Sequence, residues 1–596
     1  MNRSPSPQTS WRLLTVALVL AISTAGIIGR LAYLQIIQHD QYITEAQMFH
    51  GGDREITSHR GSILDRLGNP LAISVETFNV LADRKVWSES NAGQRSSEKL
   101  APLLNRSAQD ILTATGDAES GPALIALGVP YEQGRAIIAA GIPGVIVEPS
   151  SHRINPEGNL AAPLLGFTGR EGSGLSGLEL DLDDLLTGEP GRLIYERDSV
   201  GNPIPFGYRQ ELAPEPGGDV LLTIDRTIQR MAERELDDAI ARTGATGGTV
   251  IVQEPRTGAI LAMVSRPAFD LARLDLSDAS KMEFYRNRAV TDLYEPGSVF
   301  KLMTMAAALD TGKVNPNTTY VDTGQAVVGE RIFANWDFSA NGTTTMTNVL
   351  VRSLNTGTVW LADKILGSEI FYNYVRRFGF GESTGSGLSG EADGFYRLPT
   401  QEEWTRSDLA SNSFGQGISV TPLQIVNLVS ALANGGSLMR PYFVSEVRQG
   451  DAVTVTQPET IRQAISAQTA ATMRAMMKEV LEANLSARVP GYSAGGKSGT
   501  AYVPIGAADY RGNAYKDEVT IPSYVGFAPL EDPRVTILVK LDNLGSADFG
   551  GTLTAPVFSR LAQSILTYLR VPPDRPETVT RRTPTPTPSP SPTPTR

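Results

Sequence analysis

Ser298 and Lys301 place a hydroxyl and an amine three residues apart in a region of the chain without histidine. The four histidines all precede this pair: His39, His50, His59 and His152. A serine nucleophile after residue 152 therefore needs a base other than a local imidazole. A lysine whose pKa is lowered by its surroundings can take that role. The pair predicts lysine-activated serine chemistry.

The residues around Ser298 predict that it lies where a helix begins. Glu295-Pro296-Gly297 precedes it, and a helix-forming run at 302–309 follows and ends near Gly312. Positions i and i+3 share one face of a helix, so we expect Lys301 to reach the Ser298 hydroxyl. The alternative is that Ser298 only caps the helix and Lys301 is a surface lysine.

The spacing alone is weak evidence, because Ser96-Ser97-Glu98-Lys99 repeats it in a polar stretch that we expect to be solvated surface. Two further motifs distinguish Ser298. Ser353-Leu354-Asn355 and then Lys497-Ser498-Gly499-Thr500 follow it along the chain. This ordered set resembles the penicilloyl serine transferases, which comprise penicillin-binding proteins and serine β-lactamases. The flanking segments 294–297, 414–417 and 500–501 fit the same resemblance.

The resemblance implies a catalytic role for five residues. Ser298 would attack the carbonyl between two D-alanines of a peptidoglycan stem peptide, and Lys301 would take its proton. Ser353 would relay protons toward the leaving amine, Asn355 would orient the substrate amide, and Lys497 would supply positive charge. A second stem's amine would then resolve the acyl-enzyme and form a crosslink. A β-lactam antibiotic would acylate the same serine as a covalent inhibitor.

The resemblance also implies a substrate-binding and oxyanion side of the site, formed by Ser498, Gly499 and Thr500. The hydroxyls of Ser498 and Thr500 would receive the terminal carboxylate of the substrate. The backbone amides of Ser298 and Thr500 would form the oxyanion hole.

A lysine base near neutral pH requires a physical cause, because the reference pKa of lysine is about 10.4 and must fall by roughly 3 units. If Lys497 lies about 4 Å from Lys301, repulsion of about 4 kcal/mol at an effective dielectric near 20 supplies that shift. Burial acts in the same direction. The two lysines therefore make sense as a tuned pair.

Residues 13–29 form an uncharged, mostly apolar run between Arg12 and Arg30, and apolar residues continue to position 36. We expect a transmembrane anchor at 13–36, with residues 1–12 in the cytoplasm and the catalytic part on the extracytoplasmic side of the cell membrane. A cleaved signal peptide, with small residues at 21–25, is the alternative.

Composition narrows the function further. The 596 residues contain no cysteine, which excludes disulfides, a thiolate nucleophile and cysteine-bound zinc. We expect no cofactor and no metal. The formal net charge of −11 argues against nucleic acid as a partner.

Residues 60–72 read as a strand, a Gly-Asn-Pro turn and a second strand. They resemble the segment that opens the pedestal domain of class B penicillin-binding proteins, and residues 174–179, 186–191 and 198–205 resemble its returning segments. We expect the pedestal at 37–216, with a helix-like small head at 97–147. It would bind partners or serve as inert support. Residues 45–51 faintly resemble a glycosyltransferase motif, but the paired acidic residues are missing, so we expect a monofunctional chain.

The transpeptidase domain is expected at 217–570. Strands at 219–225, 248–253, 259–264, 524–528 and 535–541, with helices at 226–242 and 556–569, predict one antiparallel sheet built from both ends of this region. The middle would form a helical lobe, with the active site between the two layers. The Thr-Pro-rich tail, 571–596, should be disordered.

The sequence is thus identified as a multidomain α+β class B penicillin-binding protein with D,D-transpeptidase activity. The resemblance implies peptidoglycan stem peptides as substrate and a polytopic glycosyltransferase of the shape, elongation and division family as partner. A carboxypeptidase or β-lactamase that uses water as acceptor remains open, as does a non-catalytic scaffold for the polymerase.

Overall fold

The computed structural model describes residues 7–42, 51–89, 91–116, 121–169, 171–197, 204–276, 278–504, 515–545 and 550–575. The glycosyltransferase-like residues 45–50, most of the returning segment at 198–205 and the tail after residue 575 lie outside the described residues. The chain forms two compact units. One comprises residues 1–59 and 188–217, and the other comprises residues 60–187 and 218–596.

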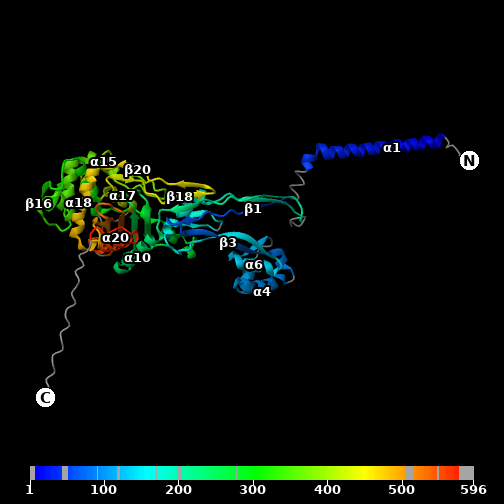
Figure 1. Cartoon of the computed structure of the whole chain (residues 1–596), viewed down its shortest axis with the longest axis horizontal. Helices are drawn as coiled ribbons and strands as arrows, with labels where there is room; N and C mark the ends of the chain where they lie inside the picture. Colours follow the sequence, from blue (N-terminus) through cyan, green and yellow to red (C-terminus); the bar gives the residue numbers. More distant parts are fainter. Residues whose placement is uncertain are drawn as a thin grey trace, which may run out of the picture. The chain divides into compact units, whose positions relative to one another are not determined.

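The first unit contains the N-terminal helix α1, Pro7–Ala32, drawn in blue in Figure 1. It continues as a π-helical turn, Tyr33–Ile37. Within the stretch Trp11–Ile37, an 18-residue window has a mean hydropathy of 1.9 and contains no buried residue, so the length and composition suffice to cross a membrane. The same unit holds an antiparallel sheet in the order β1-β8-β9: β1 Gly51–Ile56, β8 Gly191–Glu196 and β9 Arg209–Leu212.

The second unit opens with a seven-stranded sheet in the order β19-β18-β10-β2-β3-β4, with β5 paired to β3. Its strands are β2 Ile63–Leu64, β3 Pro70–Asp83, β4 Pro122–Pro130, β5 Val145–Ile154, β10 Asp219–Leu222, β18 Val444–Gln449 and β19 Ala452–Val455. The expected strand, turn and strand at 60–72 are confirmed, and Gly68 makes the turn with a φ of 82°. The sheet joins strands from both expected domains, because β10 and β18 come from after residue 217.

The head between β3 and β5 is only partly helical. Its helices are α3 Arg84–Ser88, α4 Ala92–Leu104, α5 Ala108–Ala114 and α6 Tyr131–Ala140; α6 packs next to β3, and α4 packs against α6 (Figure 1). The expectation of helix-like structure over 97–147 missed β4 and the start of β5. The expectation of a solvated Ser-x-x-Lys copy was wrong for its serines, because Ser96 and Ser97 are buried and Ser96 donates to the Pro143 carbonyl at 2.9 Å.

An ionic cluster links two segments that resemble the pedestal family. Glu179 accepts from Arg60 at 2.7 Å and from Arg153 at 2.8 Å, and its side chain is 2% exposed. Burial, the largest effect, lowers the pKa of Arg153 although Glu179 opposes it. The surrounding elements are α7 Ala162–Leu165, β6 Phe167–Thr168, β7 Gly174–Ser176, α8 Gly177–Asp181 and α9 Asp183–Leu186.

A five-stranded antiparallel sheet forms the centre of the catalytic part. Its order is β12-β11-β23-β22-β21, so strands from both ends of this region pair as expected. The bounds are β11 Gly247–Gln253, β12 Ile260–Arg266, β21 Gly495–Pro504, β22 Tyr515–Ala528 and β23 Val535–Asp542. The expected hairpin of β11 and β12 is confirmed.

Both faces of this sheet are buried, as the alternation of side chains along its strands requires. Val250 and Val252 pack with α10 and α20, whereas Ile251 packs in the main core on the other face. The covering helices are α10 Arg226–Thr243 and α20 Ala555–Tyr568 on one face, and α17 Pro422–Ala433 and α18 Ala467–Ala483 on the other, where α12 Lys301–Asp310 packs against α18. The predicted helices at 226–242 and 556–569 therefore agree with α10 and α20 to within a residue or so.

The expected helical lobe lies in the middle of this region, with short hairpins added. Its helices are α13 Met346–Val351, α14 Asn355–Trp360, a π-helical turn Leu361–Leu366, α15 Gly367–Arg377 and α16 Arg406–Asn412. Its strand pairs are β13 Thr319–Asp322 with β16 Gly342–Thr345, and β14 Gln325–Val328 with β15 Arg331–Ala334. Smaller elements are α11 Arg288–Thr291, α19 Gly550–Leu553, β17 Ser437–Met439 and β20 Thr460–Gln463.

Candidate active site

Ser298 lies in a 3-10 turn, Gly297–Phe300, and α12 begins at Lys301. The α-helix thus starts three residues later than expected. Gly297 has a φ of +56°, and a Cβ there would lie 2.7 Å from the Thr500 carbonyl. A Cβ on Gly415 would lie 2.2 Å from the Gly297 carbonyl. Only glycine fits at both positions, so the turn is held tightly between β21 and the segment at 414–417.

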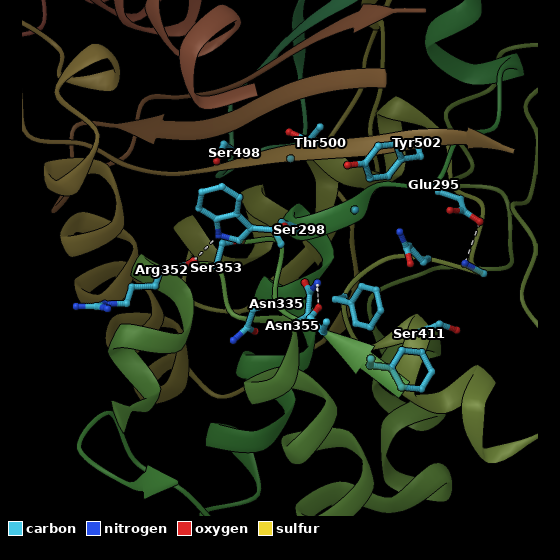
Figure 2. A pocket seen from close by; sticks show the side chains of 18 of the residues that line it. Glu295, Ser298, Asn335, Arg352, Ser353, Asn355, Ser411, Ser498, Thr500 and Tyr502 are labelled. Carbon is cyan, nitrogen blue, oxygen red and sulfur yellow. Dashed lines mark hydrogen bonds between the residues drawn. The ribbon is translucent and has the colours of Figure 1, made fainter. Parts of the chain in front are cut away.

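The turn opens onto a cavity of about 720 Å³. Six of the eight residues expected at the site line it: Ser298, Ser353, Asn355, Ser498, Gly499 and Thr500. Figure 2 shows Ser298 between Ser498 on one side and the Glu295 and Ser411 end on the other. Lys301 and Lys497 lie behind the cavity wall, at 0% and 2% exposure. The alternative of a surface lysine at position 301 is wrong.

Both buried lysines contact Ser353. Lys301 Nζ donates to the Ser353 carbonyl at 2.6 Å and to its Oγ at 3.2 Å. Lys497 Nζ donates to the same Oγ at 3.0 Å and to the Ser498 carbonyl at 3.0 Å. We expected Lys301 to reach the Ser298 hydroxyl. Within the described part of the chain, that hydroxyl makes no hydrogen bond. Lys301 donates its hydrogen bonds to Ser353 instead.

Burial and charge both act on the lysine pair. Burial first, and the nearby charge of Lys497 second, hold the pKa of Lys301 well below its usual value. Burial lowers the pKa of Lys497 to about 7. Desolvation disfavours a charged ammonium, so the neutral form of each lysine is more accessible here than it is in water. This is the condition under which a lysine can accept a proton from a hydroxyl.

Ser353 and Asn355 are held by the backbone around them. Ser353 has a φ of +55°, which is costly for a residue with a Cβ. It follows α13, and Asn355 begins α14. Asn355 Nδ2 donates to the Ala334 carbonyl at 2.8 Å, so the motif is tied to β15.

Asp322 organises the residues beside this motif, and no feature of the sequence had indicated it. Its carboxylate is 2% exposed and accepts from Asn335 at 2.9 Å, from Asn341 at 2.7 Å and from Thr356 at 2.8 Å. Although burial raises its pKa, these hydrogen bonds hold the pKa below its usual value. Asp322 thus fastens the loop that carries Trp336 and the residue that follows Asn355.

Thr500 lies on β21, the edge strand of the sheet. Its Oγ1 accepts a hydrogen bond from the Gly550 amide at 3.1 Å, which leaves its hydroxyl hydrogen to donate. A Cβ on Gly550 would lie 2.2 Å from the Gly499 carbonyl, so this approach also needs glycine. An edge strand leaves alternate backbone amides without a strand partner, which is what an oxyanion site requires.

Charged residues line the far end of the cavity, and sequence reasoning missed all of them except Glu295, which lies in the flanking segment 294–297. They are Glu295, Arg331, Arg397 and Asp408. Glu295 is 3% exposed and accepts from the Gly417 amide at 2.9 Å. No motif indicated Arg331, Arg397 and Asp408, since they come from separate segments. Among the described residues, no group of three or more potential metal ligands occurs.

Comparison with known proteins assigns the chain to a family. The family model for the penicillin-binding protein transpeptidase domain matches residues 248–563, which is more than half of the chain. The chain belongs to this family. A second model, for the penicillin-binding protein dimerisation domain, matches residues 55–222. The family match includes all eight residues expected at the site.

Full-length relatives cover almost the whole chain. Stage V sporulation protein D of Bacillus subtilis is 34% identical over 94% of this chain and 86% of its own length. Peptidoglycan D,D-transpeptidase FtsI of Escherichia coli is 30% identical over 95% of this chain and 93% of its own length. These relatives show that the family resemblance extends beyond the catalytic part into the N-terminal segments.

Solved structures share the fold. Penicillin-binding protein 2X from Streptococcus thermophilus superimposes with a TM-score of 0.73 at 26% identity, over 87% of this chain and 80% of that one. Penicillin-binding protein 3 from Mycobacterium tuberculosis, solved in complex with aztreonam, superimposes with a TM-score of 0.66 at 27% identity, over 88% of this chain and 99% of that one. The family fold is therefore present here in both of its main parts.

Proposed function

We propose that this penicillin-binding protein is a peptidoglycan D,D-transpeptidase that works through an acyl-enzyme on Ser298. The observation that supports the proposal most directly is the shared contact of two buried lysines with Ser353, beside a serine exposed to the cavity. Buried lysines with lowered pKa values have no structural need to adjoin a serine nucleophile, whereas a proton-transfer chain needs them there.

The acylation step follows from this arrangement. The Ser298 hydroxyl attacks the carbonyl between the two D-alanines and loses its proton to neutral Lys301, which lies one turn away. The C–N bond then breaks, and the proton returns to the leaving amine through Ser353. Lys497 supplies positive charge to the site. The backbone amides of Ser298 and Thr500 stabilise the oxyanion, each by roughly 3 kcal/mol. Asn355 orients the substrate amide.

The acceptor decides between the candidate reactions. In transpeptidation, the amine of a second stem attacks the Ser298 ester and forms the crosslink. A carboxypeptidase or β-lactamase would use water instead. A β-lactam mimics the D-alanine pair, so it acylates Ser298 in either case and differs only in how long it stays bound.

The test is labelled penicillin on the purified full chain in detergent. We expect a stable covalent adduct that peptide mapping places on Ser298, and no adduct with Ser298→Ala. Rapid release of the label would favour a β-lactamase. A labelled Ser298→Ala variant would overturn the serine mechanism. In cells, wall growth that continues normally with Ser298→Ala at normal protein levels would support a scaffold role instead.

The N-terminal part extends the proposal to location and partners. Helix α1 would anchor the chain in the cell membrane, with the boundaries 1–12 cytoplasmic, 13–36 membrane, 37–216 pedestal and 217–570 transpeptidase. The catalytic part would then lie on the extracytoplasmic side, where peptidoglycan is found. The pedestal would contact a polytopic glycosyltransferase of the shape, elongation and division family, and loss of co-purification after its deletion would test this.

A further inference from the structure

Three arginines line the cavity without a role in the proposed reaction: Arg352, which donates to Asn341 Oδ1 at 2.6 Å, and the pair Arg331 and Arg397. Arg331 begins β15, where its backbone pairs with Val328, but its guanidinium makes no hydrogen bond or ion pair with any residue that the structure describes. Arg397 makes one long contact, from Nη1 to Asp408 Oδ1 at 3.4 Å, and its side chain is 18% exposed. An arginine that faces a cavity without a partner has donors available to a ligand.

The two arginines lie at the same end of the cavity. Side chains alternate along a strand, so Arg331 shares a face of β15 with Phe333. Phe333 packs edge-on against Phe414, with ring centroids 6.0 Å apart, and Phe414 closely follows α16. The face that carries Arg331 therefore looks toward α16, where Asp408 holds Arg397.

The two carboxylates at this end of the cavity, Asp408 and Glu295, already accept hydrogen bonds from other residues. Asp408 Oδ2 accepts from the Thr405 amide at 2.7 Å and from its hydroxyl at 2.8 Å, which caps α16. Glu295 accepts from the Gly417 amide. Neither carboxylate contacts Arg331, so its guanidinium is available to a negative group that enters the cavity.

The direction of the substrate connects this end to a particular part of the donor. Ser298 lies between Ser498 and the Glu295 and Ser411 end (Figure 2). In the proposed reaction, the hydroxyls of Ser498 and Thr500 hold the terminal carboxylate, and the scissile carbonyl lies at Ser298. A continuous peptide then extends its preceding residues toward Glu295 and Ser411, which is the end that holds Arg331 and Arg397.

We infer that Arg331 and Arg397 bind a side-chain carboxylate of the donor stem peptide, on a residue that precedes the D-alanine pair; this inference rests on the proposed transpeptidase function. Guanidinium groups suit this ligand, because their planar donors match both oxygens of a carboxylate. The site would thus select donors by charge before the acyl transfer takes place.

The test uses two synthetic donors that end in D-Ala-D-Ala and differ at the residue before that pair, one with a side-chain carboxylate and one with the carboxamide. The full chain in detergent is assayed for D-alanine release, as kcat/KM for each donor. We expect the wild type to prefer the carboxylate donor by roughly tenfold, and Arg331→Gln to lose most of this preference. Arg331→Lys should keep part of it.

A matched variant separates this effect from a general loss of charge. Arg352→Gln removes one positive charge from the cavity wall on the Ser353 side of Ser298, and the ratio between the two donors should remain as in the wild type. Equal rates for both donors on the wild type, with normal penicillin labelling, would overturn the inference and leave the proposed function intact. Failure of penicillin to label Ser298 would overturn both.

Discussion

Lys301 and Lys497 donate hydrogen bonds to one atom, the hydroxyl oxygen of Ser353, at 3.2 and 3.0 Å. The two nitrogens are therefore no more than about 6 Å apart, where repulsion at an effective dielectric near 20 is about 3 kcal/mol. Both lone pairs of the hydroxyl are used, so its own hydrogen is left to donate elsewhere. Ser353 is thus placed to transfer a proton, and the repulsion between the two ammonium groups favours the neutral form of each lysine.

This pairing predicts a shift in the pH dependence of acylation when Lys497 is replaced by methionine. Lys301 must be neutral to act as base, so the rate rises with pH through the Lys301 pKa. The charge of Lys497 is one cause of the lowered Lys301 pKa. Without it that pKa rises, and the acid limb of the rate against pH should move to higher pH.

The measurement is the second-order rate of penicillin acylation between pH 5 and about 9. The midpoint is compared rather than the amplitude, because Lys497→Met also weakens substrate binding. Lys364→Met removes an exposed lysine outside the cavity lining and should leave the midpoint unchanged. An unmoved midpoint in Lys497→Met would contradict the coupling of the two lysines.

The same substitution should change stability in a pH-dependent way. Lys497 has a folded pKa of about 7 against an unfolded value of 10.5, so the unfolded chain binds more protons between these values. Wild-type stability from this group is lowest below pH 7 and rises toward pH 10.5, at up to about 1.4 kcal/mol per pH unit. Lys497→Met lacks this dependence.

Urea denaturation at pH 6, 8 and 9.5 tests this expectation. The stability of Lys497→Met relative to the wild type should be highest at pH 6 and should fall as the pH rises. A difference that stays constant across this range would show that Lys497 titrates alike in the folded and unfolded chains.

The motifs could be found in the sequence, but the contacts between them could not. Ser-x-x-Lys spacing suggested that Lys301 binds Ser298, because the two share a helix face. The structure turns Lys301 toward Ser353, since Ser298 lies in a 3-10 turn before the α-helix begins. Local periodicity fixes which residues share a face, whereas the partner of a buried ammonium depends on segments 50 to 200 residues away.

The positive φ of Ser353 could not be predicted either, because the sequence favours glycine or asparagine for such a conformation. It yields a prediction from two variants that both lack the hydroxyl. Ser353→Gly relieves the strain of a φ of +55°, and Ser353→Ala keeps it. The glycine variant should therefore be the more stable of the two by about 0.5 to 1 kcal/mol.

Thermal unfolding of the two variants measures this difference, and penicillin acylation should be slow in both. An alanine variant as stable as the glycine variant would mean that the chain relaxes around Ser353. Faster acylation by Ser353→Gly than by Ser353→Ala would mean that the backbone position, rather than the hydroxyl, limits the reaction.

Strand pairing was predicted well where it is local and poorly where it is distant. Two apolar runs around a turn predicted the hairpin of β11 and β12, and the structure confirms it. The strand β5, at Val145–Ile154, pairs with β3 along ten residues that precede it by about 70 positions. Its own residues carry little periodicity, so pairing with β3 decides its conformation.

The ionic cluster of Arg60, Arg153 and Glu179 provides the last prediction. Glu179 holds both Arg60 and Arg153, and all three side chains are at most 8% exposed. Glu179→Gln leaves the buried Arg153 guanidinium without a counterion and leaves Arg60 paired with Asp183 alone, so the free energy of unfolding should fall by about 3 kcal/mol. Urea denaturation measures the loss. Glu459→Gln, at an exposed ion pair with Arg440, should leave stability unchanged. Penicillin acylation of folded Glu179→Gln should match the wild type, since Glu179 does not line the cavity; a slower rate would show that the cluster also positions the catalytic residues.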